Sequence, residues 1–310
     1  MRTHQLRKLF VVGAFALVTP MIAACDPIVN APPGGGAVSN GTFRLGPFNL
    51  APMGQSGDED QGSQGNIPKP PTPFGMKNIT FDLVYADGTS VPHSAAHLHH
   101  VVLMNPARRS MFCTQQWPER FAGSGSERTP ISFPDPYAYM TNAGEQWNAL
   151  WHVMNESDQP QQVYIQYKVG YQTGANSSNT RSVTPFFLDV TGCGGSTYQV
   201  PGNGGPGSVH TNTRTWTAPW GGYLVGAGGH LHGGGIDITI RNNTQNLACT
   251  MTAKYEHSHP EGAPGSITTC PVHKRVNQGD SFSVISRYDN SQPYTDVMGI
   301  VMAYGWQGTQ

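Results

Sequence analysis

The chain has 310 residues, of which 37% are hydrophobic and only 12% are charged, and its formal net charge is −1. This length fits two domains of ordinary size or one large all-β unit, and the near-neutral charge excludes the basic surface of a nucleic-acid-binding protein. Glycine (38) and proline (25) are frequent, but the hydrophobic share is large enough to build a core. The twelve histidines are the unusual feature of this composition.

The first 24 residues have the pattern of an export signal. Arg2, Arg7 and Lys8 form a basic start, and an apolar run over 9–18 follows, which is too short for a stable membrane-spanning helix. The segment ends in Ile-Ala-Ala-Cys, which resembles the lipobox of bacterial lipoproteins, where the cysteine becomes the lipidated first residue. We therefore expect an exported cell-envelope lipoprotein anchored to the membrane at Cys25. The alternative is an ordinary signal that is cleaved nearby.

Residues 25–75 have the composition of a disordered, Pro- and Gly-rich tether. Stretches rich in these two residue types occupy 31–36 and 68–73, and an acidic run occupies 58–60. Such a composition buries too little apolar area to offset the entropy lost on ordering. We expect this segment to hold the folded part away from the membrane.

From residue 76 onward, short runs of β-forming residues alternate with turn residues. No apolar stretch of twelve or more residues with helical periodicity occurs in this part. Short strands at this spacing are typical of antiparallel sandwiches. The expected strands are Ile79–Tyr85, Leu98–Met104, Trp147–Met154, Gln162–Tyr171, Val183–Val190, Val209–Thr217, Leu231–Arg241, Ala248–Tyr255, Phe282–Tyr288 and Val297–Tyr304.

These strands divide equally between the two halves of the chain. The sequence therefore predicts an all-β fold of two tandem antiparallel β-sandwich domains, which are jelly-roll-like. The N-terminal domain is expected over 76–191 and the C-terminal domain over 192–310, with the join near 189–195.

Four of the five cysteines remain when Cys25 is set aside, and an even number in an exported chain indicates two disulfide bonds. Four cysteines allow three pairings. Cys249 and Cys270 flank one local excursion, whereas Cys113 and Cys193 lie in the other half, so we favour Cys113–Cys193 with Cys249–Cys270. No spacing among them indicates a zinc ribbon or a redox motif.

The histidines outside the signal are clustered. His230 and His232 are flanked by glycines, and in a strand residues i and i+2 point to one face, so this pair could bind zinc, copper or iron. The alternative is two polar side chains in a surface loop. By the same periodicity His97 would pair with His99, and adjacent His99 and His100 would face opposite ways unless the backbone is bulged.

Single histidines carry less information. His152 on its own is more often a buried or edge residue than a ligand. His257 and His259 lie in a Pro- and Gly-rich excursion, and we expect them to be exposed.

Several motifs together resemble the type II copper, ascorbate-dependent monooxygenases, which include the peptidylglycine hydroxylating and dopamine β-monooxygenases. The resemblance extends over about 80–305, motif by motif and in the family's order. The motifs are Leu98–Leu103, Leu150–Asn155, Gly229–Gly233, the turn Gln278–Asp280, and Asp296–Tyr304.

The resemblance implies a site with two copper ions, reduced by ascorbate or another one-electron donor, that hydroxylates a C–H bond with O₂. In this family the two coppers face each other across a solvent-filled cleft between the domains. His97 is then expected beside the first copper, where it would orient a ligand. The implied ligands are His99, His100 and His152 for the electron-transfer copper, and His230, His232 and Met298 for the O₂-binding copper.

The chain departs from this family where the peptide-amidating members bind a substrate carboxylate. The positions of their Arg, Asn and Tyr are Gly228, Ile300 and Met302 here, and none of these side chains can bind an anion. We therefore expect a small, apolar or uncharged substrate. Met302 shares a strand face with Met298 and could place a second sulfur near the copper, but packing in the core is the favoured interpretation. The family's cysteine after the methionine is Gly299 here, so its disulfides are not carried over.

Two other functions remain open. A non-catalytic lipoprotein that stores or buffers copper could use the same scaffold, and Gly-His-Leu-His-Gly also occurs in plant stress-induced proteins that resemble relatives of this family. A cupin-type site with one metal at His230 and His232 is disfavoured, because no Glu follows at the expected short spacing. In each case we expect a monomer with no nucleic-acid partner, and with the membrane contacted only through Cys25.

Overall fold

The computed structural model describes residues 36–255 and 262–308. Every regular secondary-structure element in these residues is a β-strand, which confirms the predicted all-β class. The same residues contain no helix long and apolar enough to cross a membrane. The predicted signal 1–24, the lipidation site Cys25, His257 and His259 lie outside the described residues.

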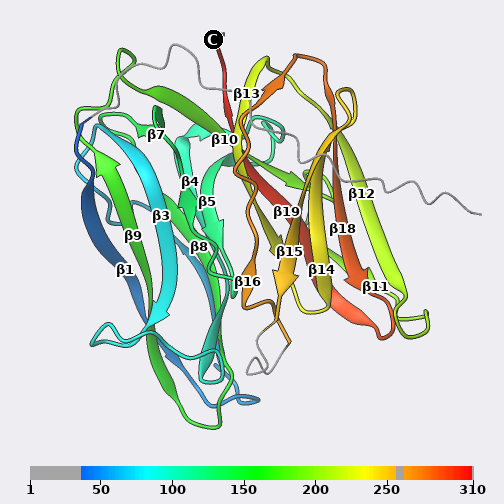
Figure 1. Ribbon diagram of the computed structural model, residues 1–310. Coiled ribbons are helices and arrows are strands. Elements are labelled where there is room, and N and C mark those ends of the chain that lie inside the picture. The colour runs from blue at the N-terminus through cyan, green and yellow to red at the C-terminus, as the bar shows by residue number, and fades with distance from the viewer. Residues whose placement is uncertain (1–35, 256–261, 309–310) are drawn as a thin grey trace, which may run out of the picture.

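The N-terminal half forms a sandwich of two sheets, which lies on the left in Figure 1. Between them lies a core rich in aromatic side chains, in which the ring of Phe121 contacts those of Tyr139 and Trp147 at centroid distances of 4.7 and 4.6 Å. One sheet contains β1 (Ser39–Leu50), β9 (Gln161–Gln172), β3 (Phe74–Val84), β6 (Ile131–Ser132) and β7 (Tyr137–Thr141). The other contains β2 (Glu59–Gln64), β8 (Asn148–Asn155), β4 (Ala96–Arg109) and β5 (Pro118–Ser124).

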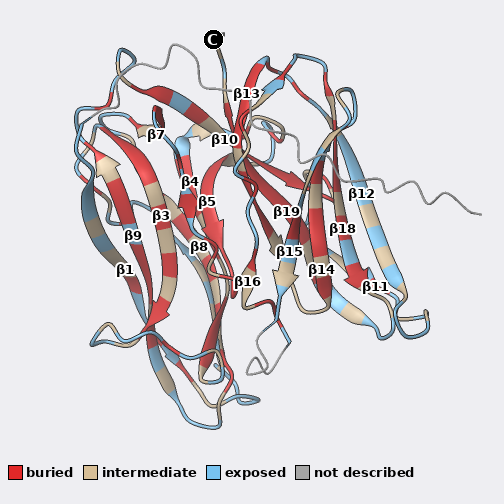
Figure 2. Cartoon of the chain, viewed as in Figure 1, coloured by how far each residue is buried: buried red, intermediate tan, exposed pale blue. Residues whose placement is uncertain are grey.

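The C-terminal half forms a second sandwich beside the first (Figure 1). Its outer strand β12 (Val209–Thr217) is largely exposed, as the pale blue stretches in Figure 2 show. The inner sheet contains β10 (Arg181–Asp189), β19 (Tyr294–Trp306), β13 (Gly222–Leu231), β17 (Lys274–Val276) and β11 (Thr197–Val200). The outer sheet contains β12 (Val209–Thr217), β18 (Ser281–Asp289), β14 (Gly235–Asn242), β15 (Leu247–Lys254) and β16 (Ser266–Ile267).

The two sandwiches share a wall. The inner sheet continues into the first sandwich through β7 and β10, so one sheet runs across both halves. Side chains of β19 alternate between the two cores, because successive residues of a strand point to opposite faces. Ile300 and Met302 pack in the first core, whereas Val301 and Ala303 pack in the second.

This wall changes the predicted domain boundary. β10 was expected in the N-terminal domain, but it pairs with β19 over residues 183–189 and with β7 only at residues 181–182. Phe187 packs in the first core and Phe186 in the second, so β10 belongs to the wall between the halves. A join near 189–195 is therefore too late in the chain to separate two independent units.

The prediction of a disordered tether is wrong from residue 36 onward. β1 pairs with β9, and β2 pairs with β8. Leu45, Phe48 and Leu50 of β1 are buried in the first core. The burial of these apolar side chains stabilises the segment. Average composition did not predict this, because glycines and prolines dominate the surrounding sequence.

Both predicted disulfide bonds are confirmed. Cys113 bonds to Cys193 with their Cα atoms 5.4 Å apart. Cys249 bonds to Cys270 with their Cα atoms 6.2 Å apart.

Each of the ten expected strands overlaps an observed strand, but one is divided. The run Leu231–Arg241 contains the end of β13, a turn over 232–234 and most of β14. Gly234 in this turn has φ +80°, and a Cβ there would lie 2.4 Å from the ring of Tyr294. The turn therefore needs glycine at this position. It ends β13 at Leu231, between His230 and His232.

Candidate metal centre

The adjacent histidines of β4 are brought together by a bulge. Leu98 pairs with Val153 and His100 with His152, so His99 is an extra residue between two ladder positions. A bulge redirects the side chains next to it. This resolves the sequence-based ambiguity, because His99 and His100 lie near the same metal-binding centre despite being neighbours in a strand.

The first histidine set has the geometry of a metal site. One ring nitrogen from each of His99, His100 and His152 lies within 4.8 Å of the other two. The Nδ1 atoms of His99 and His100 are 3.1 Å apart. Two nitrogens that each lie about 2.0 Å from one tetrahedral ion are separated by about 3.3 Å. The set therefore needs little movement to hold an ion.

A carboxylate from the segment predicted as a tether orients the third histidine. Glu59 on β2 has its Oε2 2.5 Å from Nε2 of His152. This contact leaves Nδ1 of His152 for a metal, and carboxylates commonly hold metal-binding imidazoles in this way. Sequence reasoning missed Glu59 because the acidic run around it suggested a solvated linker.

We expect Glu59→Gln to weaken copper binding at the first histidine set by about tenfold or more, the usual effect of losing an outer carboxylate. Competitive titration of the full chain with a chromophoric copper chelator measures this affinity. Asp87→Asn is a matched control, since this carboxylate lies on an exposed turn. Unchanged copper affinity in Glu59→Gln would show that the carboxylate does not orient His152.

The second histidine pair lies where β13 ends. The rings of His230 and His232 are nearly perpendicular, with centroids 5.1 Å apart. His230 is the penultimate residue of β13, and His232 follows the strand directly. The expected convergence of the two imidazoles is therefore observed.

Hydrogen bonds determine which nitrogen each of these two histidines offers. Nδ1 of His232 lies 2.7 Å from the carbonyl oxygen of Asp296, which can only accept, so this nitrogen carries the proton. Asp296 has φ 53°, an uncommon left-handed conformation. Nδ1 of His230 lies 3.1 Å from Oε1 of Glu127. The Nε2 atoms of both rings are buried and have no hydrogen-bond partner among the described residues.

Glu127 reaches this site from the other half of the chain. It follows β5, its side chain is only 2% exposed, and its Oε1 also accepts a hydrogen bond from the backbone N–H of Gly125 at 2.9 Å. Its Oε2 is buried and has no partner among the described residues. No sequence signal identified Glu127, because Gly-Ser-Gly-Ser-Glu has the composition of a surface turn.

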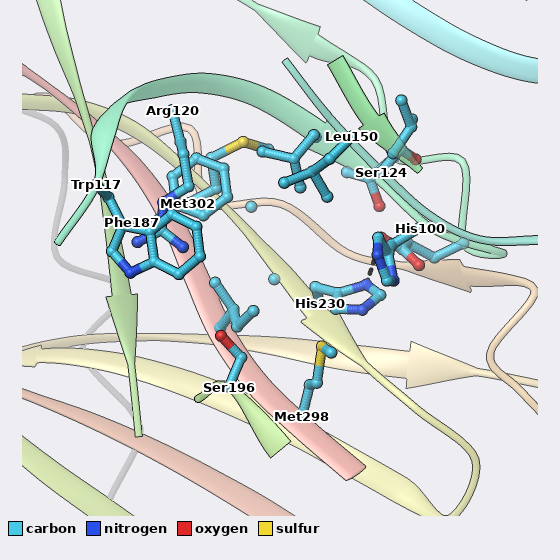
Figure 3. Close-up of a pocket in the computed structure, with 18 residues that line it drawn as sticks. His100, Trp117, Arg120, Ser124, Leu150, Phe187, Ser196, His230, Met298 and Met302 are labelled. Atoms are coloured by element: carbon cyan, nitrogen blue, oxygen red, sulfur yellow. Dashed lines mark hydrogen bonds and ion pairs between the residues drawn. The ribbon is translucent and has the colours of Figure 1, made fainter. Parts of the chain in front are cut away.

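Met298 and His232 are connected through one tyrosine. The hydroxyl of Tyr288 accepts a hydrogen bond from the backbone N–H of His232 at 2.8 Å and donates one to the carbonyl of Met298 at 2.5 Å. Burial raises the pKa of Tyr288 well above its usual value, so the hydroxyl keeps its proton. The sulfur of Met298 points toward the ring of His230 (Figure 3). Sequence reasoning missed Tyr288 because its role depends on pairing between distant strands.

The two sets are in contact. The rings of His99 and His232 have centroids 4.4 Å apart. The resemblance implied two separate sites facing each other across a solvent-filled cleft. The structure instead brings all five histidines into one cluster at the wall between the sandwiches.

The cluster keeps most of its imidazoles neutral, which is the form that binds metals. Burial, with His230 and His152 nearby, lowers the pKa of His100 to about 3. Burial and the neighbouring His230 lower the pKa of His232 well below its usual value. Burial also lowers the pKa of His230, but Glu127 outweighs this effect and the pKa is raised.

The remaining predicted site residues surround the cluster. His97 is buried, contacts Glu156 through Nδ1, and has its ring 5.9 Å from that of His99. Ile300 and Met302 line a cavity next to His230.

Two cavities meet the cluster. One, of about 130 Å³, is lined mainly by apolar side chains and reaches His100, His230 and Met298. The other, of about 420 Å³, is more polar and reaches His99 and His232 from another side. The cluster is therefore accessible from two directions with different chemistry.

The donor set fits copper. It combines buried imidazole nitrogens that have no partner with a thioether, and thioethers favour Cu(I). The carboxylate contacts of Glu59 and Glu127 orient the rings of His152 and His230.

Comparison with protein families gives a match over residues 148–304 to the family described as stress up-regulated Nod 19. This range is just over half of the chain. The chain belongs to the stress up-regulated Nod 19 family. The part that matches the Nod 19 family contains His152, His230, His232 and Met298, whereas the paired histidines of β4 lie before it.

Two fungal proteins are similar to this Nod 19 family member over most of its length. The probable copper-dependent oxygenase M1 of Phoma sp. is 25% identical over 263 residues, which cover 74% of this chain and 63% of the Phoma protein. The probable copper-dependent oxygenase clz3 of Cochliobolus lunatus is 25% identical over 251 residues, which cover 74% of this chain and 79% of that protein. The chain thus spans less than two thirds of the Phoma relative.

Similarity to solved structures is distant. A structure of PNGF-II has a TM-score of 0.38 and 11% identity, and it covers 87% of this chain and 66% of that one. A score this low says nothing about function.

Proposed function

We propose that this protein is a copper-dependent monooxygenase that hydroxylates a C–H bond of a small substrate with O₂ and an external one-electron reductant such as ascorbate. The observation that carries the proposal is the convergence of five histidines and Met298 at the wall between the sandwiches. The Nε2 atoms of His230 and His232 are buried there and have no hydrogen-bond partner in the described part of the chain. The copper-dependent oxygenase names of the two fungal relatives support it.

The two donor sets have different chemistry. Three imidazoles, from His99, His100 and His152, suit a copper that only passes electrons. Two imidazoles with the thioether of Met298 favour Cu(I) and leave coordination positions open. Bound copper would supply one-electron redox chemistry at the first set and O₂ binding at the second.

The chain's own residues prepare these donors. Glu59 and Glu127 hold Nε2 of His152 and Nδ1 of His230, which leaves the opposite nitrogens for the metals. Tyr288 holds the segments of His232 and Met298 together. The apolar cavity beside Met298 would exclude water from the substrate.

The setting we propose is the cell envelope. The export signal and the lipobox-like sequence favour anchoring of a monomer through lipid at Cys25. The two disulfide bonds support an oxidising compartment.

The test is copper stoichiometry followed by turnover. We expect the full chain to bind two copper ions, and to consume O₂ with ascorbate only when a small aromatic probe with a weak benzylic C–H bond, such as p-toluamide or p-toluate, is added. Mass spectrometry should then detect the hydroxylated probe. Two bound coppers without substrate-dependent O₂ uptake across a panel of such probes would favour copper storage. Tight binding of one zinc and no copper would contradict both functions.

A further inference from the structure

The apolar cavity of about 130 Å³ beside the second donor set has two chemically different ends. His100, His230 and Met298 lie at one end, and Arg120, Trp117 and Phe187 lie together at the other (Figure 3). A cavity of about 150 Å³ can hold a benzene ring. The space therefore suits a small apolar body that extends from the metal ligands to Arg120.

Arg120 is a buried cation with no direct counter-ion among the residues that the structure describes. It is 8% exposed, and its guanidinium lies over the rings of Phe187 and Trp117 at 4.6 and 5.1 Å. Within residues 36–255 and 262–308, its Nε has no hydrogen-bond partner. Burial lowers the pKa of Arg120 to about 10, so the side chain remains charged at neutral pH. The two rings contact its face and leave N–H donors unused.

The acid that acts on Arg120 electrostatically does not pair with it. Asp189 uses Oδ1 to accept hydrogen bonds from the backbone N–H and the hydroxyl of Thr191, at 2.9 and 2.8 Å. Its Oδ2 is buried and, among the described residues, has no partner either. Burial raises the pKa of Asp189. A buried guanidinium left in this state is costly unless a ligand completes it.

We propose that Arg120 binds a carboxylate of the substrate, whose apolar body then fills the cavity and directs a C–H bond toward His230 and Met298. The guanidinium matches a carboxylate in charge and in geometry. This inference rests on the proposed oxygenase function, and it assigns Arg120 as a specificity-determining residue. It departs from the uncharged substrate expected from Gly228, Ile300 and Met302.

The departure has a structural reason. Gly228 and Met302 are paired across β13 and β19, and Ile300 pairs with His230, so these three positions line the cavity wall made by the C-terminal half. Arg120 enters from β5 of the N-terminal half. The C-terminal half therefore lacks the anion-binding side chain of the peptide-amidating enzymes, and Arg120 of the N-terminal half supplies a cation in its place.

The test compares two isosteric probes, p-toluate and p-toluamide, by calorimetric titration of the copper-free and copper-loaded full chain. We expect p-toluate to bind about tenfold or more tightly than p-toluamide, the scale of a hydrogen bond to a charged group. Arg120→Met, which keeps the apolar stem, should remove this preference, and Arg120→Lys should keep part of it. Arg214→Met is the matched control, because Arg214 lies over Trp216 on β12, outside this cavity.

Equal binding of the two probes by the unaltered chain, no detectable binding of p-toluate, or a preference that persists in Arg120→Met would each overturn the inference. If Arg120→Met fails to fold, equal binding of p-toluate and p-toluamide by Arg120→Lys would also overturn it, since a retained charge should retain part of the preference. Copper counting and O₂ uptake test the oxygenase separately, because the probe preference is read in copper-free protein.

Discussion

Replacing Met298 with isoleucine is expected to abolish hydroxylation while the chain remains folded and keeps its first copper. The substitution removes the soft sulfur that favours Cu(I) but conserves most of the side-chain volume, so its packing cost is small. We expect the Cu(I) affinity of the second donor set to fall by at least about tenfold, since loss of even an outer partner has effects of this size. Titration with a Cu(I)-specific chelator and O₂ uptake measure the two effects.

The control for this experiment is Met53→Ile, since Met53 is an exposed methionine outside the cluster. It should change neither Cu(I) affinity nor turnover. The first donor set should still bind Cu(II) in Met298→Ile, with an unchanged electron paramagnetic resonance signal. Full Cu(I) affinity at the second set in Met298→Ile would show that Met298 is not a ligand.

The parts of the site that could be predicted from sequence are those with a local signal. The convergence of His230 and His232 could be predicted because strand periodicity and the glycine turn at Gly234 depend only on residues that are adjacent in sequence. The pairing of His99 with His100 needed more, because strand periodicity separates them and only the bulge opposite β8 brings them together. The resemblance to a known family selected this pair, and the strand register explains how two adjacent histidines can reach the same centre.

The parts that could not be predicted depend on contacts between distant segments. Glu59 and Glu127 lie in stretches whose composition suggests a linker and a turn, and no sequence motif singled out Arg120. Each acquires its role only when β2 pairs with β8, or when β5 and the loop after it meet the C-terminal half. Composition averages over neighbours in sequence, whereas these roles are set by neighbours in space.

The shared wall has a consequence for how the cluster is held. Because β19 packs into both cores, a shift of this strand would move Met298 together with Ile300 and Val301. The two donor sets are therefore coupled through packed side chains, which do not deform independently. Ring contact between His99 and His232 requires the two halves to keep one relative position.

Gly125 packs closely against residues of both donor sets, and Gly125→Ala is expected to damage both sets at once. A Cβ at this position would lie 2.6 Å from Cε1 of His230, 2.7 Å from Oε2 of Glu127 and 2.8 Å from the carbonyl oxygen of His99. The last of these atoms is backbone and the first belongs to a ring held by a carboxylate, so neither can move away cheaply.

We expect Gly125→Ala to lower the free energy of unfolding by about 1–3 kcal/mol, the usual cost of overpacking. We also expect it to lower turnover by about a hundredfold, because displacements near 1 Å at an active site have effects of this size. Thermal denaturation and O₂ uptake of the copper-loaded chain measure the two effects. Gly205→Ala is the matched control, since a Cβ at Gly205 meets no atom within 4 Å. Normal turnover in Gly125→Ala would mean that the cluster relaxes around the added methyl group, and that the contact between the two donor sets is not needed for the reaction.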